Sequence, residues 1–265
     1  MDHIKSAEVV KDLVHMGAYK SRLPLKDLLL RAFLSGALLG IATVLAFTVA
    51  VQSGLYFLGA LAFPVGFAMI ILLGLELVTS NFAVVPMALM DKQASMSNLI
   101  YSWACAFLGN LVGSVFFGAL FFVYITKAGH TLDGPVIDKV IAVAQDKTLG
   151  YKQLGSIGLL VVFTKAFLCN WMVSMGAVMG ATSSSTIGKL AALWLPIFTF
   201  FALRLEHSVV NMFVIPAAMM LKADITLSDW WLWNQIPATL GNIAGAFLMT
   251  GAALYFTFGR KKDGK

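Results

Sequence analysis

Long apolar segments, separated by short polar stretches, occupy most of the chain. Each is close to the roughly 20 residues that an α-helix needs to cross a bilayer. We therefore expect six membrane-spanning helices, at about 27–51, 55–78, 98–125, 154–181, 187–205 and 233–258. Shorter apolar segments follow the second and fifth helices, at about 79–90 and 206–221. The pattern predicts an all-α integral membrane protein.

Two segments carry the same polar residues in the same register. Residues 75–90 (LELVTSNFAVVPMALM) and 205–220 (LEHSVVNMFVIPAAMM) align without a gap. The shared Glu-x4-Asn-x4-Pro pattern comprises Glu76, Asn81 and Pro86 in the first copy, and Glu206, Asn211 and Pro216 in the second. Such residues are rare at membrane depth. They predict two broken helices that meet at one site, with a proline and an unwound polar stretch, residues 79–81 in the first copy, at each break.

The repeat extends to a second pair of segments, LGNLVG at 108–113 and LGNIAG at 240–245. If each half crosses the membrane three times, the second half enters from the opposite face, which gives an inverted three-plus-three repeat. The halves would be about 25–126 and 154–260, joined by an external linker at about 127–153. The alternative is that short apolar motifs recur by chance in a membrane protein.

The composition is that of a membrane protein and not of a soluble domain. Hydrophobic residues make up 59% and charged residues 12%, with a mean hydropathy of +0.85, whereas roughly a quarter of a soluble domain is charged. The net charge of +6 is concentrated in the tails, so it indicates topology and not a nucleic-acid surface. Basic tails and an even number of spans predict cytoplasmic termini in a multi-pass protein of the cell inner (plasma) membrane. Lysines in the 127–153 linker oppose this orientation.

The segments outside the single transmembrane domain, 25–260, are short. Residues 1–24 resemble a cytoplasmic amphipathic lead-in and lack the features of a signal peptide, and 261–265 form a basic cytoplasmic tail. The residues expected to share the apolar face of the lead-in are Val9, Val10, Leu13, Val14 and Met16. Cys105 and Cys169 lie in apolar spans without a CxxC partner, so we expect neither a disulfide nor a metal site.

The repeated glutamates allow two interpretations. Glu76 and Glu206 could accept hydrogen bonds from backbone amides exposed at each break and so hold its shape. The alternative is that they bind a cation or relay protons. Matched carboxylates at symmetric breaks favour the structural role, which we extend to Asn81 and Asn211.

His207 is where the two copies differ, because Leu77 occupies the corresponding position. An imidazole near the middle of the membrane can carry or exchange a proton at physiological pH. The alternative is a neutral, buried histidine bonded to a backbone carbonyl. The asymmetry at an otherwise symmetric site favours the functional interpretation.

Three motifs in order, Glu-Leu-Val-Thr-Ser at 76–80, Cys-Asn-Trp-Met-Val at 169–173 and Glu-His-Ser-Val-Val-Asn-Met at 206–212, resemble the formate/nitrite transporter family. The resemblance covers all six spans. It implies an aquaporin-like protomer with broken second and fifth helices, a homopentamer with one pore per protomer, and transport of small anions. It implies neither an enzyme nor a cofactor. The aquaporin Asn-Pro-Ala boxes are missing.

Carried over by position, the resemblance assigns residues along the pore. His207 is the central histidine, Thr79 its hydrogen-bonding partner, and Asn170 the asparagine of the fourth span. Leu77 and Phe63 are expected at an apolar constriction on one side, and Phe200 on the other. An anion loses several kcal/mol of hydration in a dry apolar ring, whereas a weak acid can take a proton and cross neutral. Vestibule cations would gather the anion, and His207 or its water would supply the proton.

The chain departs from the family pattern at two places. Sixteen residues before Asn170, where the family usually has a vestibule lysine, stands Leu154, so Lys152 is the nearest candidate and Lys147 the next. Lys165 matches a position that is often basic, although it could also only extend towards the interface.

Arg204 stands where relatives usually have a small residue. One interpretation is an ion pair with Glu76, Glu206 or a neighbouring subunit. The other is a fixed cation beside the pore that binds an anion directly and favours a larger or more strongly hydrated anion such as bicarbonate.

Two other classes of function compete with a small-anion channel or proton-linked transporter. A membrane enzyme could use Glu76, Glu206 and His207 as metal ligands, but the chain lacks a Glu-x-x-His pair. An aquaporin-like pore for neutral solutes would show neither anion currents nor pH-dependent uptake. The physiological anion, among formate, nitrite, bicarbonate and hydrosulfide, is not determined by the sequence.

Overall fold

The structure, a computed structural model, describes residues 3–259. Within this range every regular element is helical, apart from an isolated antiparallel bridge between His3 and Ser183.

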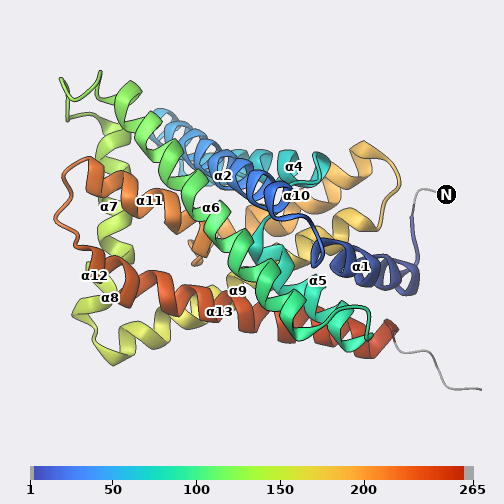
Figure 1. Cartoon of the computed structure of the whole chain (residues 1–265). Coiled ribbons are helices and arrows are strands. Elements are labelled where there is room, and N and C mark those ends of the chain that lie inside the picture. Colours follow the sequence, from blue (N-terminus) through green and yellow to red (C-terminus); the bar gives the residue numbers. More distant parts are fainter. Residues whose placement is uncertain (1–2, 260–265) are drawn as a thin grey trace, which may run out of the picture.

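The long helices pack in pairs, α2 (Leu25–Ser53) along α6 (Met96–Ile125) and α9 (Ser156–Ala181) along α13 (Ile236–Ala246) (Figure 1). The other helices are α1 (Ser6–Lys20), α3 (Tyr56–Ala62), α4 (Pro64–Leu72), α5 (Val78–Met90), α7 (Pro135–Lys147), α8 (Leu149–Gln153), α10 (Thr186–Ala202), α11 (Ser208–Met220) and α12 (Leu227–Trp230), with π-helical turns η1 (Trp231–Gln235), η2 (Phe247–Ala252) and η3 (Tyr255–Gly259).

Helices long and apolar enough to cross a membrane coincide with four of the six predicted spans. Within the described chain they are Leu25–Ser53, Met96–Ile125, Ser156–Ala181 and Leu227–Gly259. The predicted second and fifth spans are shorter than expected, because α4 ends at Leu72 and α10 at Ala202. The short apolar helices α5 and α11 follow them after a break, in agreement with the two short segments expected from the sequence.

Both breaks have the same backbone geometry. Gly74 and Arg204 adopt the left-handed conformation, with φ of 62° and 53°. The next amide in each copy folds back onto the preceding helix: Leu75 N donates to Ile70 O at 3.0 Å, and Leu205 N to Phe200 O at 3.1 Å. The two halves therefore share a local structure as well as a sequence pattern.

The prolines of the repeat do not make these breaks. Pro86 and Pro216 lie inside the continuous helices α5 and α11. Residues 79–81, expected to be unwound, form the first turn of α5. The prediction was wrong on both points, because the left-handed residues at 74 and 204 interrupt the chain earlier.

Two asparagines of the LGN segments hold the start of each short helix. Asn110 Oδ1 accepts from Val78 N at 2.9 Å, and Asn242 Oδ1 from Ser208 N at 2.8 Å. Their amide groups donate back to the carbonyls of Glu76 (3.0 Å) and Glu206 (2.9 Å). These asparagines, and not the glutamate side chains, accept from the backbone amides at the start of each short helix, so the predicted partners of Glu76 and Glu206 were wrong.

Two peripheral segments complete the architecture. The 127–153 stretch, expected as a linker, contains α7 and α8, and α7 lies at the end of the molecule opposite α1 (Figure 1). Four of the predicted apolar residues of α1 are buried, but Met16 is 41% exposed and does not share that face. The basic tail, 261–265, lies outside the described residues.

The close packing of α13 against α9 predicts that one methyl group added at Gly245 lowers the stability of the protein. A Cβ at Gly245 would lie 2.0 Å from Phe167 O, a backbone atom of α9 that cannot move aside by a rotamer change. Gly245→Ala is expected to lower stability by ~1–3 kcal/mol, as overpacking does. Thermal unfolding in detergent measures this. Gly180→Ala, whose Cβ would lie 3.7 Å from Leu193, should leave the midpoint nearly unchanged.

Candidate transport pathway

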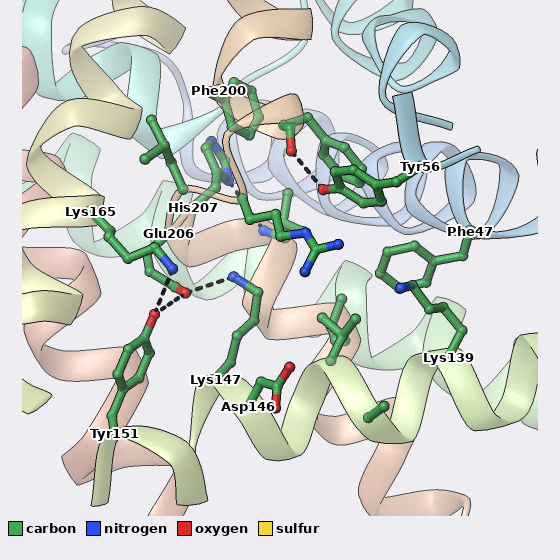
Figure 2. A pocket seen from close by; sticks show the side chains of 17 residues that line it. Phe47, Tyr56, Lys139, Asp146, Lys147, Tyr151, Lys165, Phe200, Glu206 and His207 are labelled. Carbon is green, nitrogen blue, oxygen red and sulfur yellow. Dashed lines mark hydrogen bonds and ion pairs between the residues drawn. The ribbon is translucent and has the colours of Figure 1, made fainter. Parts of the chain in front are cut away.

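A cavity of about 260 Å³ lies beside the second break. Figure 2 shows how side chains from α7, α8, α9 and the α10–α11 break converge on it. The charged residues that line it are Lys139, Lys147, Lys165, Arg204, Asp146 and Glu206. Cations outnumber carboxylates, so the cavity is a place where an anion is favoured over a cation.

His207 lies at one boundary of this cavity, in the break before α11. Its Nδ1 accepts from Val210 N at 3.2 Å and caps the helix. A neutral imidazole whose Nδ1 accepts must carry its proton on Nε2. That nitrogen lies 3.1 Å from Thr79 Oγ1, so it is placed to donate to the hydroxyl group of the other break. The predicted His207–Thr79 pair is present.

Aromatic rings close the space next to His207. Phe200 stacks against the imidazole, with centroids 5.6 Å apart. Phe63 meets Phe200 edge-on at 5.5 Å and stacks on Phe201 at 4.1 Å. Phe63 and Phe200, expected on opposite sides, therefore lie in one aromatic cluster.

Leu77 occupies in the first break the position that His207 occupies in the second. The two residues precede α5 and α11 with nearly equal backbone angles, φ −111° and −105°, ψ 116° and 115°. Leu77 is fully buried and does not line the cavity. The symmetry thus places an apolar side chain where the other half has an imidazole.

Asn170, in the middle of α9, links the first turn of α5 to α13. Its amide nitrogen donates to Thr79 O at 3.0 Å and to Asn242 O at 2.8 Å. Asn170 therefore orients the backbone of Thr79, whereas His207 contacts its hydroxyl. It does not line the cavity itself.

Each repeated glutamate is buried in an ion pair with a lysine from outside the long helices. Glu76 Oε1 accepts from Lys20 at 2.9 Å, and Glu206 Oε2 lies 2.8 Å from Lys147. Asn81 and Asn211 donate to the same carboxylates at 2.9 and 2.8 Å. The asparagines of the repeat are thus bound to its glutamates, as a structural role requires. Neither pairing was predicted from the sequence, since partners such as Lys20 and Glu76 lie 56 residues apart; Lys147 was expected only as a candidate vestibule lysine.

Glu206 has further partners at the cavity wall. Its carboxylate accepts from Tyr151 Oη at 2.7 Å and from Asn234 at 3.1 Å. Burial, and then the charge of Glu206, raise the pKa of Tyr151, so this hydroxyl group remains a donor. Lys165 Nζ lies 3.3 Å from the Tyr151 oxygen and completes the network (Figure 2).

The structure separates the two candidates for the vestibule lysine. Lys152 pairs with Asp229 at 2.8 Å and is not among the residues that line the cavity. Lys147, the second candidate, lines it. Lys147 lies in the last turn of α7 and Lys152 in the last turn of α8, and the spacing of residues in the sequence does not predict these two helices.

Arg204 is exposed at the cavity. Its backbone is in the left-handed conformation, which is unfavourable for a residue with a side chain. A residue other than glycine in the left-handed region costs roughly 1–3 kcal/mol. Its guanidinium carbon lies 4.4 Å from the centroid of Tyr56. Within residues 3–259 no carboxylate forms an ion pair with it, so the interpretation as a partner of Glu76 or Glu206 was wrong.

A bundle of membrane-length helices around a cation-rich cavity, with polar groups buried at two helix breaks, defines a membrane transport protein. Comparisons with known proteins give the family. A family model described as "Formate/nitrite transporter" matches residues 7–256, so the chain belongs to this family. It is therefore a membrane transporter and not an enzyme.

The relatives support this assignment along the whole chain. An "Uncharacterized transporter YrhG" of Bacillus subtilis is 34% identical over 98% of this chain and 95% of the relative. A "Probable formate transporter" of Methanothermobacter thermautotrophicus is 33% identical over 95% and 96%. Among solved structures, an "FNT family ion channel" superimposes with a TM-score of 0.82 at 26% identity, covering 94% of this chain and 98% of that one. A "Pentameric formate channel with formate bound" gives a TM-score of 0.72 at 26% identity, covering 92% and 98%.

Proposed function

We propose that this chain transports small monovalent anions of weak acids, of the formate and nitrite type, through a pore that passes His207. The observation that carries the proposal is the position of His207. It bounds the cation-lined cavity, stacks on Phe200 and contacts Thr79 of the opposite break. The names of the relatives, which include formate transporters and channels, support the substrate class.

In this proposal the cavity gathers the anion and the aromatic cluster requires it to be neutral. Phe63, Phe200 and Phe201 offer no hydrogen bonds to replace lost water, so a charged species pays several kcal/mol to pass. Protonation of the anion removes most of this cost. In the resting, neutral ring the helix-capping bond at Nδ1 keeps the imidazole in place. His207 takes up a proton from the solvent and passes one, directly or through water, to the anion, so the imidazolium that donates is left as the neutral ring.

We further propose that the protomer is a six-span, aquaporin-like inverted repeat. Support comes from the matched breaks and from their lysines: Lys20 reaches Glu76 from α1, and Lys147 reaches Glu206 from α7, at the opposite end of the molecule (Figure 1). The last described turn, η3, packs on α1, which supports both ends of the described chain lying on one face of the membrane. We take this face as the cytoplasmic one from the basic tails, and the membrane as the cell inner (plasma) membrane. A homopentamer with one pore per protomer follows the likeness to a pentameric channel.

Transport by purified protein in liposomes tests the proposal. We expect formate and nitrite uptake to exceed that of protein-free liposomes and to fall as external pH rises, because less of the weak acid can be protonated. Bicarbonate and hydrosulfide in the same assay rank the anions, and glycerol serves as an uncharged solute. Glycerol uptake without any anion flux would contradict anion transport and favour an aquaporin-like pore. Preferential bicarbonate flux would support the alternative in which Arg204 selects the anion.

A further inference from the structure

The cations of the cavity are not equally engaged by the protein. Lys147 is paired with Glu206 at 2.8 Å, and Lys165 lies 3.3 Å from the Tyr151 hydroxyl oxygen. Arg204 and Lys139 form no ion pair within the part of the chain that the structure describes. Asp146 is the only lining carboxylate apart from Glu206. Two cations thus remain available to an anion.

Arg204 and Lys139 both lie over the aromatic ring of Tyr56. The guanidinium carbon of Arg204 lies 4.4 Å, and Lys139 Nζ 5.7 Å, from the centroid of Tyr56. Each contact is favourable, but two like charges drawn to one ring repel each other. An anion between them would offset that repulsion. The Tyr56 hydroxyl group donates to Phe201 O at 2.7 Å, so the ring holds the cations and leaves anion binding to their N–H groups.

Comparison of the two breaks singles out Arg204. Gly74, in the same left-handed conformation, makes the first break without a side chain. The second break makes the same turn with a residue that the conformation disfavours, so the turn itself does not require arginine. Observed strain of this kind points to a function of the side chain.

We propose that Arg204 and Lys139 form an anion site in the vestibule that selects planar oxyanions over anions with a single acceptor atom. A guanidinium offers two parallel N–H groups that match the two oxygens of a carboxylate, nitrite or bicarbonate. Hydrosulfide and chloride have one acceptor atom and cannot take this bidentate contact. The site precedes the step at His207, and this inference rests on the proposed anion transport only for its physiological use.

Arg204→Lys is the sharpest test, because it keeps the charge and the left-handed residue but removes the planar fork. In liposome flux measured against anion concentration, we expect the half-saturating concentrations of formate and nitrite to rise about tenfold, the value of one charge-assisted hydrogen bond. That of hydrosulfide should change less than about twofold. If the half-saturating concentrations of the oxyanions and of hydrosulfide change by the same factor, the site attracts anions by charge alone and the proposal is overturned.

Equilibrium binding separates this inference from the transport proposal. Sodium formate should raise the thermal unfolding midpoint of the wild-type protein in detergent above its value in sodium chloride of equal ionic strength. The difference should disappear in Arg204→Lys, Arg204→Gly and Lys139→Gln. It should persist in Lys222→Gly, which removes an exposed left-handed cation (φ 68°) away from the cavity.

The outcomes distinguish the two proposals. A formate-specific shift that depends on Arg204, in a protein that transports no weak acid, would leave the binding site standing and reject the transport function. Transport with no formate-specific shift, or with a shift that survives in Arg204→Lys, would reject the binding site alone. Arg204→Gly should fold at least as well as the wild type, because glycine adopts the same turn at position 74.

Discussion

Glu206→Ala is expected to abolish most of the stable, folded protein. The carboxylate is 1% exposed and accepts from Tyr151, Asn211 and Asn234 in addition to its pairing with Lys147. Removing one partner of a buried ion pair costs ~3–5 kcal/mol, because the remaining charge has no partner. That is a large part of the stability of a typical domain, ~5–15 kcal/mol. The yield of monodisperse protein and the thermal midpoint after detergent extraction measure the loss.

The symmetry of the repeat supplies a graded comparison. Glu76 has two partners, Lys20 and Asn81, so Glu76→Ala should destabilise the protein less than Glu206→Ala. Glu8→Ala, an exposed glutamate on α1, should leave both measurements unchanged. If Glu206→Ala yields protein as stable as the Glu8→Ala control, the carboxylate does not hold the second break.

His207→Asn is expected to reduce weak-acid flux by about 10²-fold or more and to flatten its pH dependence, since general acid–base groups contribute about 10²–10⁴-fold. Asparagine is an effective helix N-cap, so it can replace Nδ1 as the acceptor for Val210 N and preserve the fold. It cannot take up or release a proton in this pH range. Stopped-flow uptake of formate into liposomes across external pH measures both effects.

Two further variants locate the effect in the histidine. Thr79→Val removes the hydroxyl partner of Nε2 at 3.1 Å while keeping the side-chain shape, and should lower flux by a smaller factor. His130→Asn, an exposed histidine in the turn after α6, should behave as the wild type. A His207→Asn protein with the wild-type pH profile would reject a proton role for this residue.

The local pattern along the chain was sufficient to predict the main helices and the existence of the two breaks. Long apolar segments predict spans by length alone, and four of them were confirmed as membrane-length helices. The ungapped Glu-x4-Asn-x4-Pro repeat predicted that the breaks would be alike, and their hydrogen bonds are. The prolines do not mark the breaks, because Pro86 and Pro216 remain inside α5 and α11 while the left-handed residues Gly74 and Arg204 turn the chain.

The sequence by itself determined a helical membrane protein of the formate/nitrite transporter family, because apolar length and motif order are local properties that need no knowledge of packing. Tertiary structure decided which distant groups meet. The buried carboxylates take Lys20 and Lys147, Asn110 and Asn242 cap the short helices, and Arg204 lies over Tyr56 instead of a glutamate. These partners lie 30 to 150 residues apart, and burial forces each polar group to find whichever partner the fold brings within reach.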